Sequence, residues 1–347
     1  MKRLALATSA ALLAAAVWAA PGARVPGTGM GGASPFATDH YPGFEDLDAF
    51  DKPERRTPSW FLGLEKDNAA DQFAWAKRME AEGSLRAARR GYDALVRQWP
   101  ASPEAPQAQL ALARLWETKL QEYDEAFDAY DYLLDFYPRA CDYAEIVAEQ
   151  YKIVNLLAKN KRTWFGLSFT STRSLRRKYE HVVRRAPGAE YAADAFLKIA
   201  DLREQDSDWE EAVKVYGAVQ SRYDGTVQAR TAAYLEAAAR MHLARRLAYN
   251  NPRLKDTRGY LKLALQRYPD HERAEEMKGW IGEIDTWLSE EDWKSARFYD
   301  TRQRTRHAAL SAYEKFVKEH PDSAHADEAR ARIDEINAAR GAAAERK

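Results

Sequence analysis

The chain has 347 residues, and its 53 basic and 53 acidic side chains give a formal net charge of zero. This balance argues against a nucleic-acid-binding protein, which needs a strongly basic surface, and the mean hydropathy of −0.64 excludes a protein with several membrane spans. There are 63 alanines but only 19 valines and isoleucines together. Alanine favours helices and strands need β-branched residues, so the composition predicts an all-α fold. The single cysteine, Cys141, excludes an intramolecular disulfide and a zinc site built on several thiolates.

Residues 1–19 have the layout of a cleavable signal peptide. A basic start, Met1-Lys2-Arg3, precedes a long apolar run, and small residues stand at Val17 and Ala19 before Ala20. The alternative is a membrane anchor, for which the run is at the short limit of a spanning helix. No cysteine lies near the cleavage point. We therefore expect export by cleavage after Ala19, without a lipid anchor.

Residues 20–66 have the composition of a flexible linker. They hold 13 of the 31 glycines and prolines of the chain, and such segments do not build a packed core. Between Asp39 and Asp51 there are five acids and no Lys or Arg, with Tyr41, Phe44 and Phe50 interleaved. We interpret this stretch as a solvated tether, with a short docking peptide as the alternative.

From residue 67 onward one pattern repeats six times. Its anchors are Pro100, Pro138, Pro187, Asp224, Pro269 and Pro321. Eight residues before each anchor stand Tyr92, Tyr130, Tyr179, Tyr216, Leu261 and Tyr313. The residue twelve before each anchor is small in four of the six copies, and the residue five before is always apolar. This spacing places one apolar stripe on one face of a helix that the proline then ends.

A small residue, an aromatic, an aliphatic and a proline in this order are typical of the second helix of a tetratricopeptide repeat. We therefore predict an all-α tetratricopeptide-repeat solenoid over residues 67–340, with six helix pairs. A capping helix follows near 322–340, and residues 341–347 form a tail. The anchors are 37 to 52 residues apart, against about 34 in the usual repeat, and the third repeat carries an insertion at residues 159–172.

This insertion is a candidate contact surface. From Lys159 to Lys178 there are seven basic residues and no acids, and Trp164 and Phe165 lie within the run. Arg173, Arg176 and Arg177 follow the aromatic cluster and suit an acidic partner or anionic lipid heads. The alternative, which we favour, is a loop that folds back and fills the concave groove with its aromatic side chains.

No catalytic or cofactor-binding motif is visible in the sequence. The spacings typical of metalloproteases, serine hydrolases, nucleotide-binding loops and EF-hands are absent. His320 and His325 flank an expected turn, but no third metal ligand accompanies them in the sequence. We expect a protein that is not an enzyme and needs no metal or cofactor.

Three segments resemble the outer-membrane-protein assembly factor BamD family of periplasmic tetratricopeptide-repeat proteins. They are the aromatic-glycine insertion Trp164-Phe165-Gly166-Leu167, the run from Asp256 to Asp270, and the run from Ser289 through Arg297-Phe298-Tyr299 to His320-Pro321-Asp322. Family members are typically lipoproteins, and this chain lacks the cysteine that would carry the lipid.

The resemblance implies a non-enzymatic scaffold that binds the outer-membrane assembly machinery or unfolded outer-membrane proteins. It places the partner contact on Arg297, Phe298 and Tyr299. Helix packing is the alternative for these residues and is favoured for Phe298. We expect a periplasmic protein, peripheral to the outer membrane if it follows the family, with no nucleic-acid partner. The competing hypotheses are an adaptor of the cell-division or trans-envelope class and an envelope enzyme on a repeat scaffold.

Overall fold

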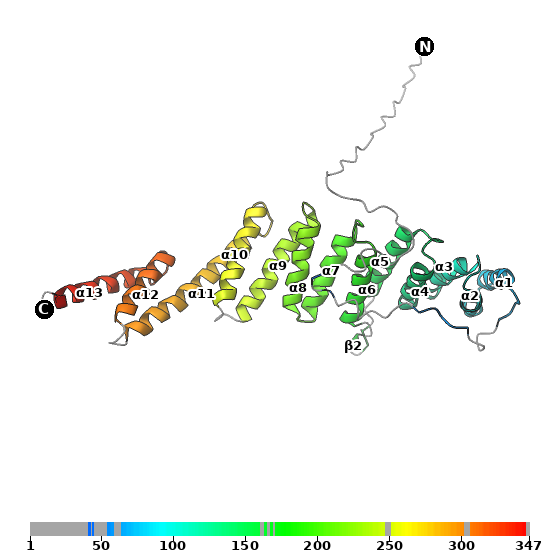
Figure 1. Cartoon of the computed structure of the whole chain (residues 1–347), viewed down its shortest axis with the longest axis horizontal. Coiled ribbons are helices and arrows are strands. Elements are labelled where there is room, and N and C mark those ends of the chain that lie inside the picture. Colours follow the sequence, from blue (N-terminus) through cyan, green and yellow to red (C-terminus); the bar gives the residue numbers. More distant parts are fainter. Residues whose placement is uncertain are drawn as a thin grey trace, which may run out of the picture. The chain divides into compact units, whose positions relative to one another are not determined.

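The computed structural model describes residues 41, 42, 44, 54–58, 64–159, 163, 164, 167, 168, 171–246, 251–301 and 306–344. All of them belong to one compact unit, Phe36–Lys347. Within these residues the fold is helical, apart from one hairpin of two short strands (Figure 1). The predicted signal peptide lies outside the described residues.

The helices follow one another as six antiparallel pairs and a final single helix (Figure 1). The pairs are α1 Ala69–Ala81 with α2 Leu85–Gln98, α3 Ala105–Arg114 with α4 Tyr123–Phe136, α5 Tyr143–Lys159 with α6 Thr172–Arg185, α7 Ala192–Gln205 with α8 Trp209–Arg222, α9 Val227–Arg246 with α10 Asn251–Arg267, and α11 Ala274–Asp300 with α12 Arg306–Glu319. A π-helical segment, η2 Leu115–Leu120, extends α3. The last helix is α13, Ala326–Ala344.

The predicted anchors end the second helix of every pair. Each of these helices stops two residues before its anchor. At the five proline anchors this is because proline cannot donate the backbone hydrogen bond that the next turn requires. The prediction of six helix pairs and a capping helix is confirmed. One boundary differs, since α13 continues to Ala344 and the predicted tail at 341–347 begins inside it.

The repeating apolar register forms the core. The residues twelve, eight and five positions before each anchor are buried in all six repeats, with exposed fractions of 6% or less. Four of the five anchor-register tyrosines also share one polar contact, a hydrogen bond to an acid at the end of the preceding helix. These bonds are Tyr92 to Glu80 at 2.7 Å, Tyr130 to Glu117 at 2.7 Å, Tyr216 to Glu204 at 3.0 Å and Tyr313 to Asp300 at 3.2 Å. In the third repeat Asn155 takes the place of the acid, 2.8 Å from the Tyr179 hydroxyl.

Successive repeats are joined by a second set of tyrosines. Tyr137, next to the anchor Pro138, donates to the carbonyl of Pro100 at 3.0 Å. Tyr223, next to the anchor Asp224, donates to the carbonyl of Pro187 at 2.8 Å. Each bond holds the end of one repeat to the turn of the repeat before it, so the stacking does not depend on apolar burial alone.

Two hydrophobic clusters divide the C-terminal part along α11. The first half of α11 packs with α9 and α10 through Met277, Ile284 and Leu288. The second half packs with α12 and α13 through Trp293 and Ala296. One helix of 27 residues therefore contributes to two separate cores.

Candidate protein-interaction surfaces

The C-terminal end of α11 carries the step from Arg297 to Tyr299. The buried residues of this part of the helix are Trp293 and Ala296, and the three residues that follow Ala296 are exposed. Phe298 is 50% exposed and Tyr299 38% exposed, with their rings 5.8 Å apart, edge to face. Half of the Phe298 surface faces solvent, so the choice between helix packing and a partner contact stays open for this residue.

The next residue, Asp300, is held by the protein itself. Its carboxylate accepts hydrogen bonds from Arg332 of α13 at 2.8 and 3.0 Å and from the Tyr313 hydroxyl at 3.2 Å. Burial and this carboxylate raise the pKa of Tyr313 to about 12. The exposed step therefore ends at an internally bonded acid that fixes the end of α11 to α12 and α13.

The insertion in the third repeat contains a two-stranded hairpin. Strands β1 Thr163–Trp164 and β2 Leu167–Ser168 pair antiparallel, with Trp164 opposite Leu167. Phe165 and the Trp164 side chain lie outside what the structure describes. Whether this loop fills the groove or contacts a partner stays a prediction.

The three arginines after the insertion do not form one surface. Arg173 is exposed and Arg177 is partly buried, whereas Arg176 is only 4% exposed. The Arg176 guanidinium lies 2.8 Å from Asp206 and 3.5 Å from the fully buried Glu180. Arg176 is therefore part of the interior, and its prediction as a partner-binding residue is wrong.

Glu180 receives a second cation from the next repeat. The Arg203 guanidinium of α7 lies 3.8 Å from Glu180 and 3.2 Å from Asp208. Since a buried carboxylate needs compensating charge, Arg176 and Arg203 explain how Glu180 is tolerated with no exposed surface. This network joins the third repeat to the fourth.

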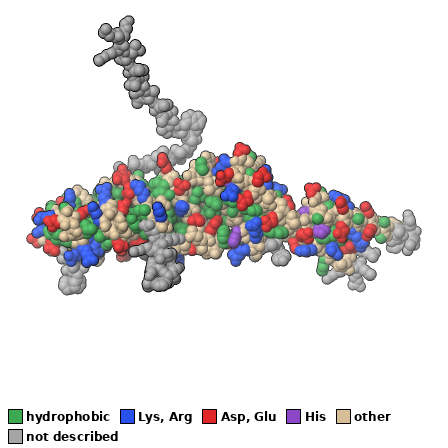
Figure 2. Space-filling model, turned by 180° about the vertical axis from the view of Figure 1, so that it is seen from behind, with side chains coloured by type: hydrophobic (Ala, Val, Ile, Leu, Met, Phe, Trp, Pro, Cys, Tyr) green, Lys and Arg blue, Asp and Glu red, His purple; other side chains and the backbone are tan. Residues whose placement is uncertain are grey.

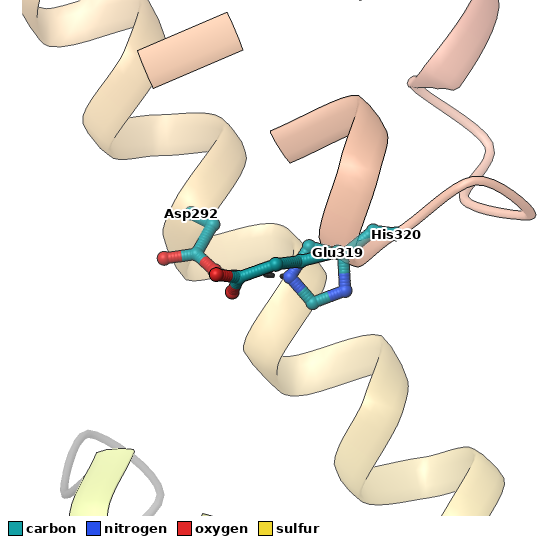
Figure 3. A group of neighbouring side chains, drawn as sticks. All are labelled: Asp292, Glu319 and His320. Carbon is teal, nitrogen blue, oxygen red and sulfur yellow. Dashed lines mark hydrogen bonds and ion pairs between the residues drawn. The ribbon is translucent and has the colours of Figure 1, made fainter. Parts of the chain in front are cut away.

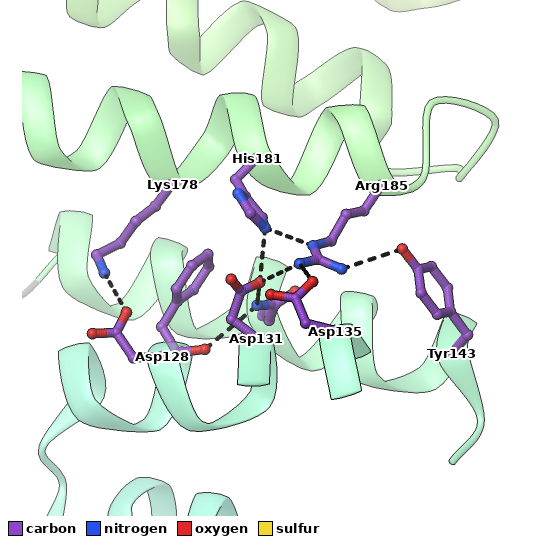
Figure 4. Close-up of polar contacts among 9 residues, drawn as sticks. Asp128, Asp131, Asp135, Tyr143, Lys178, His181 and Arg185 are labelled. Atoms are coloured by element: carbon purple, nitrogen blue, oxygen red, sulfur yellow. Dashed lines mark hydrogen bonds and ion pairs between the residues drawn. The ribbon is translucent and has the colours of Figure 1, made fainter. Parts of the chain in front are cut away.

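A second charge network joins α4 to α6 (Figure 4). Basic side chains three and four residues apart on α6 face acidic side chains at similar spacing on α4: Lys178 near Asp128, His181 near Asp131, and Arg185 near Asp131 and Asp135. Burial alone would raise the pKa of Asp131, but His181 and Arg185 outweigh it and hold that pKa well below its usual range. Much of the positive charge after the insertion is therefore neutralised within the protein.

One pocket opens between α5, α6 and α7. Its volume is about 290 Å³, and Lys159, Lys198 and Asp201 lie on its wall beside Tyr179 and Leu202. Lys159 is the last residue of α5 and adjoins the insertion. The pocket is large enough for one or two side chains of a bound segment, and its wall carries charges of both signs.

Two residues of the predicted linker lie in the core. Tyr41 is 1% exposed and Phe44 is 8% exposed, and both pack against Phe196 of α7. Further along, the guanidinium of Arg56 lies 3.0 Å from Asp93 of α2. The prediction of a solvated tether is therefore wrong at Tyr41 and Phe44. The aromatic residues within an acidic run were the signal for the docking alternative.

The two C-terminal histidines both pair with carboxylates of α11. His320 Nε2 lies 2.9 Å from Asp292, and His325 Nε2 lies 3.0 Å from Glu290. Asp292, Glu319 and His320 place one ligand atom each within 4.8 Å of one another (Figure 3). Glu319 precedes His320 in the sequence, and the fold adds Asp292 of α11. Both histidine contacts are hydrogen bonds, and they tie the α12–α13 turn to α11.

Other features bear on the class of function. Burial, and then the neighbouring Asp142, raise the pKa of the Cys141 thiol, which is the opposite of what a nucleophilic cysteine needs. On the face drawn in Figure 2, acidic and basic side chains are interspersed along the described residues. None of the helices in the described ranges is long and apolar enough to span a bilayer.

Comparison with known proteins identifies the repeat. A tetratricopeptide-repeat family model matches residues 194–226, which hold most of α7 and all of α8. A search of curated proteins finds no match.

Several solved structures are similar to the chain. YrrB, described as a TPR protein with an unusual peptide-binding site, is 17% identical over 62% of this chain and 94% of its own, with a TM-score of 0.29. A tetratricopeptide-repeat protein from Parabacteroides merdae is 12% identical over 75% and 96%, with a TM-score of 0.28. A putative kinesin light chain from Podosopora anserina is 14% identical over 64% and 98%, with a TM-score of 0.26.

Superpositions with such scores carry no argument about function. The family match and the helix pairs agree on the fold: the chain is an all-α tetratricopeptide-repeat solenoid. Such solenoids are typically non-enzymatic scaffolds that bind protein partners.

Proposed function

We propose that this chain is an exported, non-enzymatic adaptor that assists outer-membrane protein assembly by holding protein partners, in the manner of the BamD family. The observation that carries the proposal is the exposed step Arg297-Phe298-Tyr299 on α11. The resemblance to the family assigns the partner contact to these residues. Arginine and tyrosine are also the residue types that concentrate binding energy at interface centres.

The contact is tested on the partner recovered from envelope extract with the mature chain as bait. Arg297→Ala should weaken the complex by about 2 kcal/mol, or roughly 30-fold in Kd, because an interface cation is lost. Arg340→Ala, at an exposed position of α13, is the matched control and should bind as the unchanged chain does. Normal binding by folded Arg297→Ala would place the contact elsewhere on the solenoid.

Because Arg176 is buried, fewer arginines near the insertion can speed association with an acidic partner. Among the three arginines only Arg173 is exposed, so Arg173→Gln should mainly slow association, and the effect should shrink in high salt. Surface-plasmon measurements at two ionic strengths separate this kinetic effect from the affinity loss expected for Arg297→Ala.

Location in the periplasm is the second part of the proposal. It rests on the signal-peptide layout of residues 1–19 and on the absence of cysteine before Cys141. Without a lipid, the protein would reach the outer membrane through protein contacts. Mass spectrometry of the protein purified from the envelope should find a mature N-terminus at Ala20. A chain that retains Met1, or an acylated terminus, would contradict export by cleavage without lipidation.

A further inference from the structure

The buried aromatic residues of the N-terminal segment occupy a defined site between the third and fourth repeats. The Tyr41 and Phe44 rings stack with centroids 5.0 Å apart. The Phe196 ring lies 5.7 Å from Tyr41 and 5.0 Å from Phe44. Next to Phe196, the Tyr223 ring is 5.6 Å away, edge to face. The ends of α6 and α8 and the start of α7 thus surround a cluster of four aromatic rings.

Two arginines border this aromatic site. The guanidinium carbon of Arg184 lies 5.6 Å from the Tyr41 ring centre and 5.4 Å from that of Phe44. The guanidinium carbon of Arg222 lies 4.4 Å from the Tyr41 ring centre. A cation within about 6 Å of a ring face is attracted to it, so the site recognises aromatic rings by charge as well as by burial.

An aromatic side chain at this place is peculiar to one repeat junction. Phe196 stands nine residues after its anchor, and the equivalent residues after the other anchors are Gln109, Val147, Ala233, Lys278 and Arg330. At this register position only the Pro187 junction carries an aromatic residue. A general requirement of repeat stacking would recur at each junction, so this residue points to a local role.

The bound segment shows what chemistry the site selects. A turn closes between the Tyr41 carbonyl and the Phe44 amide, 3.0 Å apart, and the proline at position 42 suits such a turn. The turn brings both rings to one side. The surrounding run from Asp39 to Asp51 contains five acids and no Lys or Arg, which complements the charges of Arg184 and Arg222.

We infer that this junction is a binding site for acidic peptide segments of partner proteins that present two aromatic residues three positions apart, and that the chain's own Tyr41–Phe44 segment occupies it in cis. A covalently linked segment is present at an effective concentration of about millimolar. It therefore stays bound even if its intrinsic affinity is weak, and a partner segment must compete with it. The inference rests on the proposed function only in that the chain binds proteins, because this site does not include the Arg297 step.

The test uses the mature chain and a fluorescent peptide with the sequence of residues 39–51. Tyr41→Ala/Phe44→Ala empties the site and should bind the peptide at least tenfold more tightly than the unchanged chain, whose apparent dissociation constant should be about millimolar because the linked segment competes. In the emptied chain, Arg222→Gln should weaken peptide binding several-fold. The matched control, Arg246→Gln at the exposed end of α9, should not. A peptide with alanine in place of both aromatic residues should fail to bind.

Several results would overturn the inference. The first is that the emptied and unchanged chains bind the peptide with equal affinity. The second is that the unchanged chain shows no binding up to millimolar peptide. The third is that Arg222→Gln and Arg246→Gln lose the same peptide affinity. Loss of helical structure in both the double variant and Phe44→Ala would overturn it too, because a displaceable segment cannot be required for folding. A dimer of the unchanged chain that becomes monomeric in the double variant would instead identify a second copy as the occupant. None of these readouts uses the Arg297 contact, so the two proposals fail separately.

Discussion

The middle of the solenoid and its C-terminal end use the same residue types in different ways. In the middle region, α4 to α8, arginines and acids are drawn into contacts between repeats, as at Arg185 with Asp135 and Arg203 with Glu180. In the C-terminal module, from Trp293 through α13, Arg297, Phe298 and Tyr299 stay on the surface. Buried groups of the first kind hold repeats in register, whereas exposed groups of the second kind remain accessible to a partner. A high content of basic and aromatic residues therefore does not by itself locate an interface.

The largest effect is expected from emptying the core of the middle region. Tyr216 is 1% exposed, and Tyr216→Ala should lower the free energy of unfolding by about 3–5 kcal/mol, the usual cost of removing a large buried ring. Tyr216→Phe keeps the ring and loses only the hydrogen bond to Glu204, so it should cost about 0.5–1.5 kcal/mol. Urea unfolding followed by circular dichroism measures both. A cost below about 1 kcal/mol for Tyr216→Ala would show that this ring is not a core residue.

A slightly smaller effect is expected from breaking the buried charge network. Glu180→Ala leaves Arg176 and Arg203 without the carboxylate between them and should cost about 3 kcal/mol, at the low end for a buried pair because Asp206 and Asp208 remain. Glu283→Ala removes the partly exposed partner of the exposed Arg245 and should cost less than about 1 kcal/mol. Equal costs in the same unfolding assay would break the contrast between buried and exposed charges.

Alkaline pH should ionise Tyr313 in the folded protein before the middle tyrosines of the same register. The folded-state pKa of Tyr313 is raised to about 12, above its ordinary value of about 10, and burial raises the pKa of Tyr130 and Tyr216 further. Because the folded state keeps a proton that the unfolded chain releases, the stability from Tyr313 is fully present below pH about 10 and is lost as the pH rises towards 12. We expect a loss of up to about 2 kcal/mol from this group.

The assignment of this loss to Tyr313 has a direct control. Unfolding titrations at a series of pH values should show a smaller decrease above pH about 10 for Tyr313→Phe, which has no phenol to ionise. An unchanged decrease in that variant would assign the alkaline instability to tyrosines of the middle region instead.

The smallest effect is expected at the exposed step. Phe298→Ser and Tyr299→Ser should change the free energy of unfolding by no more than about 0.5 kcal/mol, because both side chains are at least 38% exposed. Thermal unfolding of the two variants beside Tyr313→Phe is sufficient to compare them. A cost above about 2 kcal/mol would mean that these rings stabilise the fold. The exposed step would then not differ in role from the buried groups of the middle region.

The repeat architecture could be predicted because its signals are local. A proline ends a helix wherever it occurs in this register, and residues such as Ala212 and Tyr216, four apart, lie on one helix face whatever the rest of the chain does. Arg297 is exposed, and its role as a partner contact stays a prediction. The Trp164–Phe165 insertion, in contrast, stays a prediction.

The remaining features depend on residues that are distant in the sequence. Arg176 looked like a surface residue because it belongs to a run of seven basic residues without an acid, yet its partner Asp206 lies thirty positions away on the next repeat. In the sequence, the first eight helices of the solenoid lie between Tyr41 and the end of α8 at Arg222. A segment without helical periodicity gives no sign of where it will bind, so only the fold shows that Tyr41 and Phe44 meet Phe196.

The shared helix α11 has a mechanical consequence. With 27 residues it is about 40 Å long, and it is embedded at one end against α9 and α10 and at the other against α12 and α13. A load applied near Tyr299 is therefore carried along a stiff rod, since bending it would break consecutive backbone hydrogen bonds. The other end of this rod packs through Ile284 and Leu288 against α9 and α10. A force on the C-terminal end is therefore transmitted to the fifth repeat.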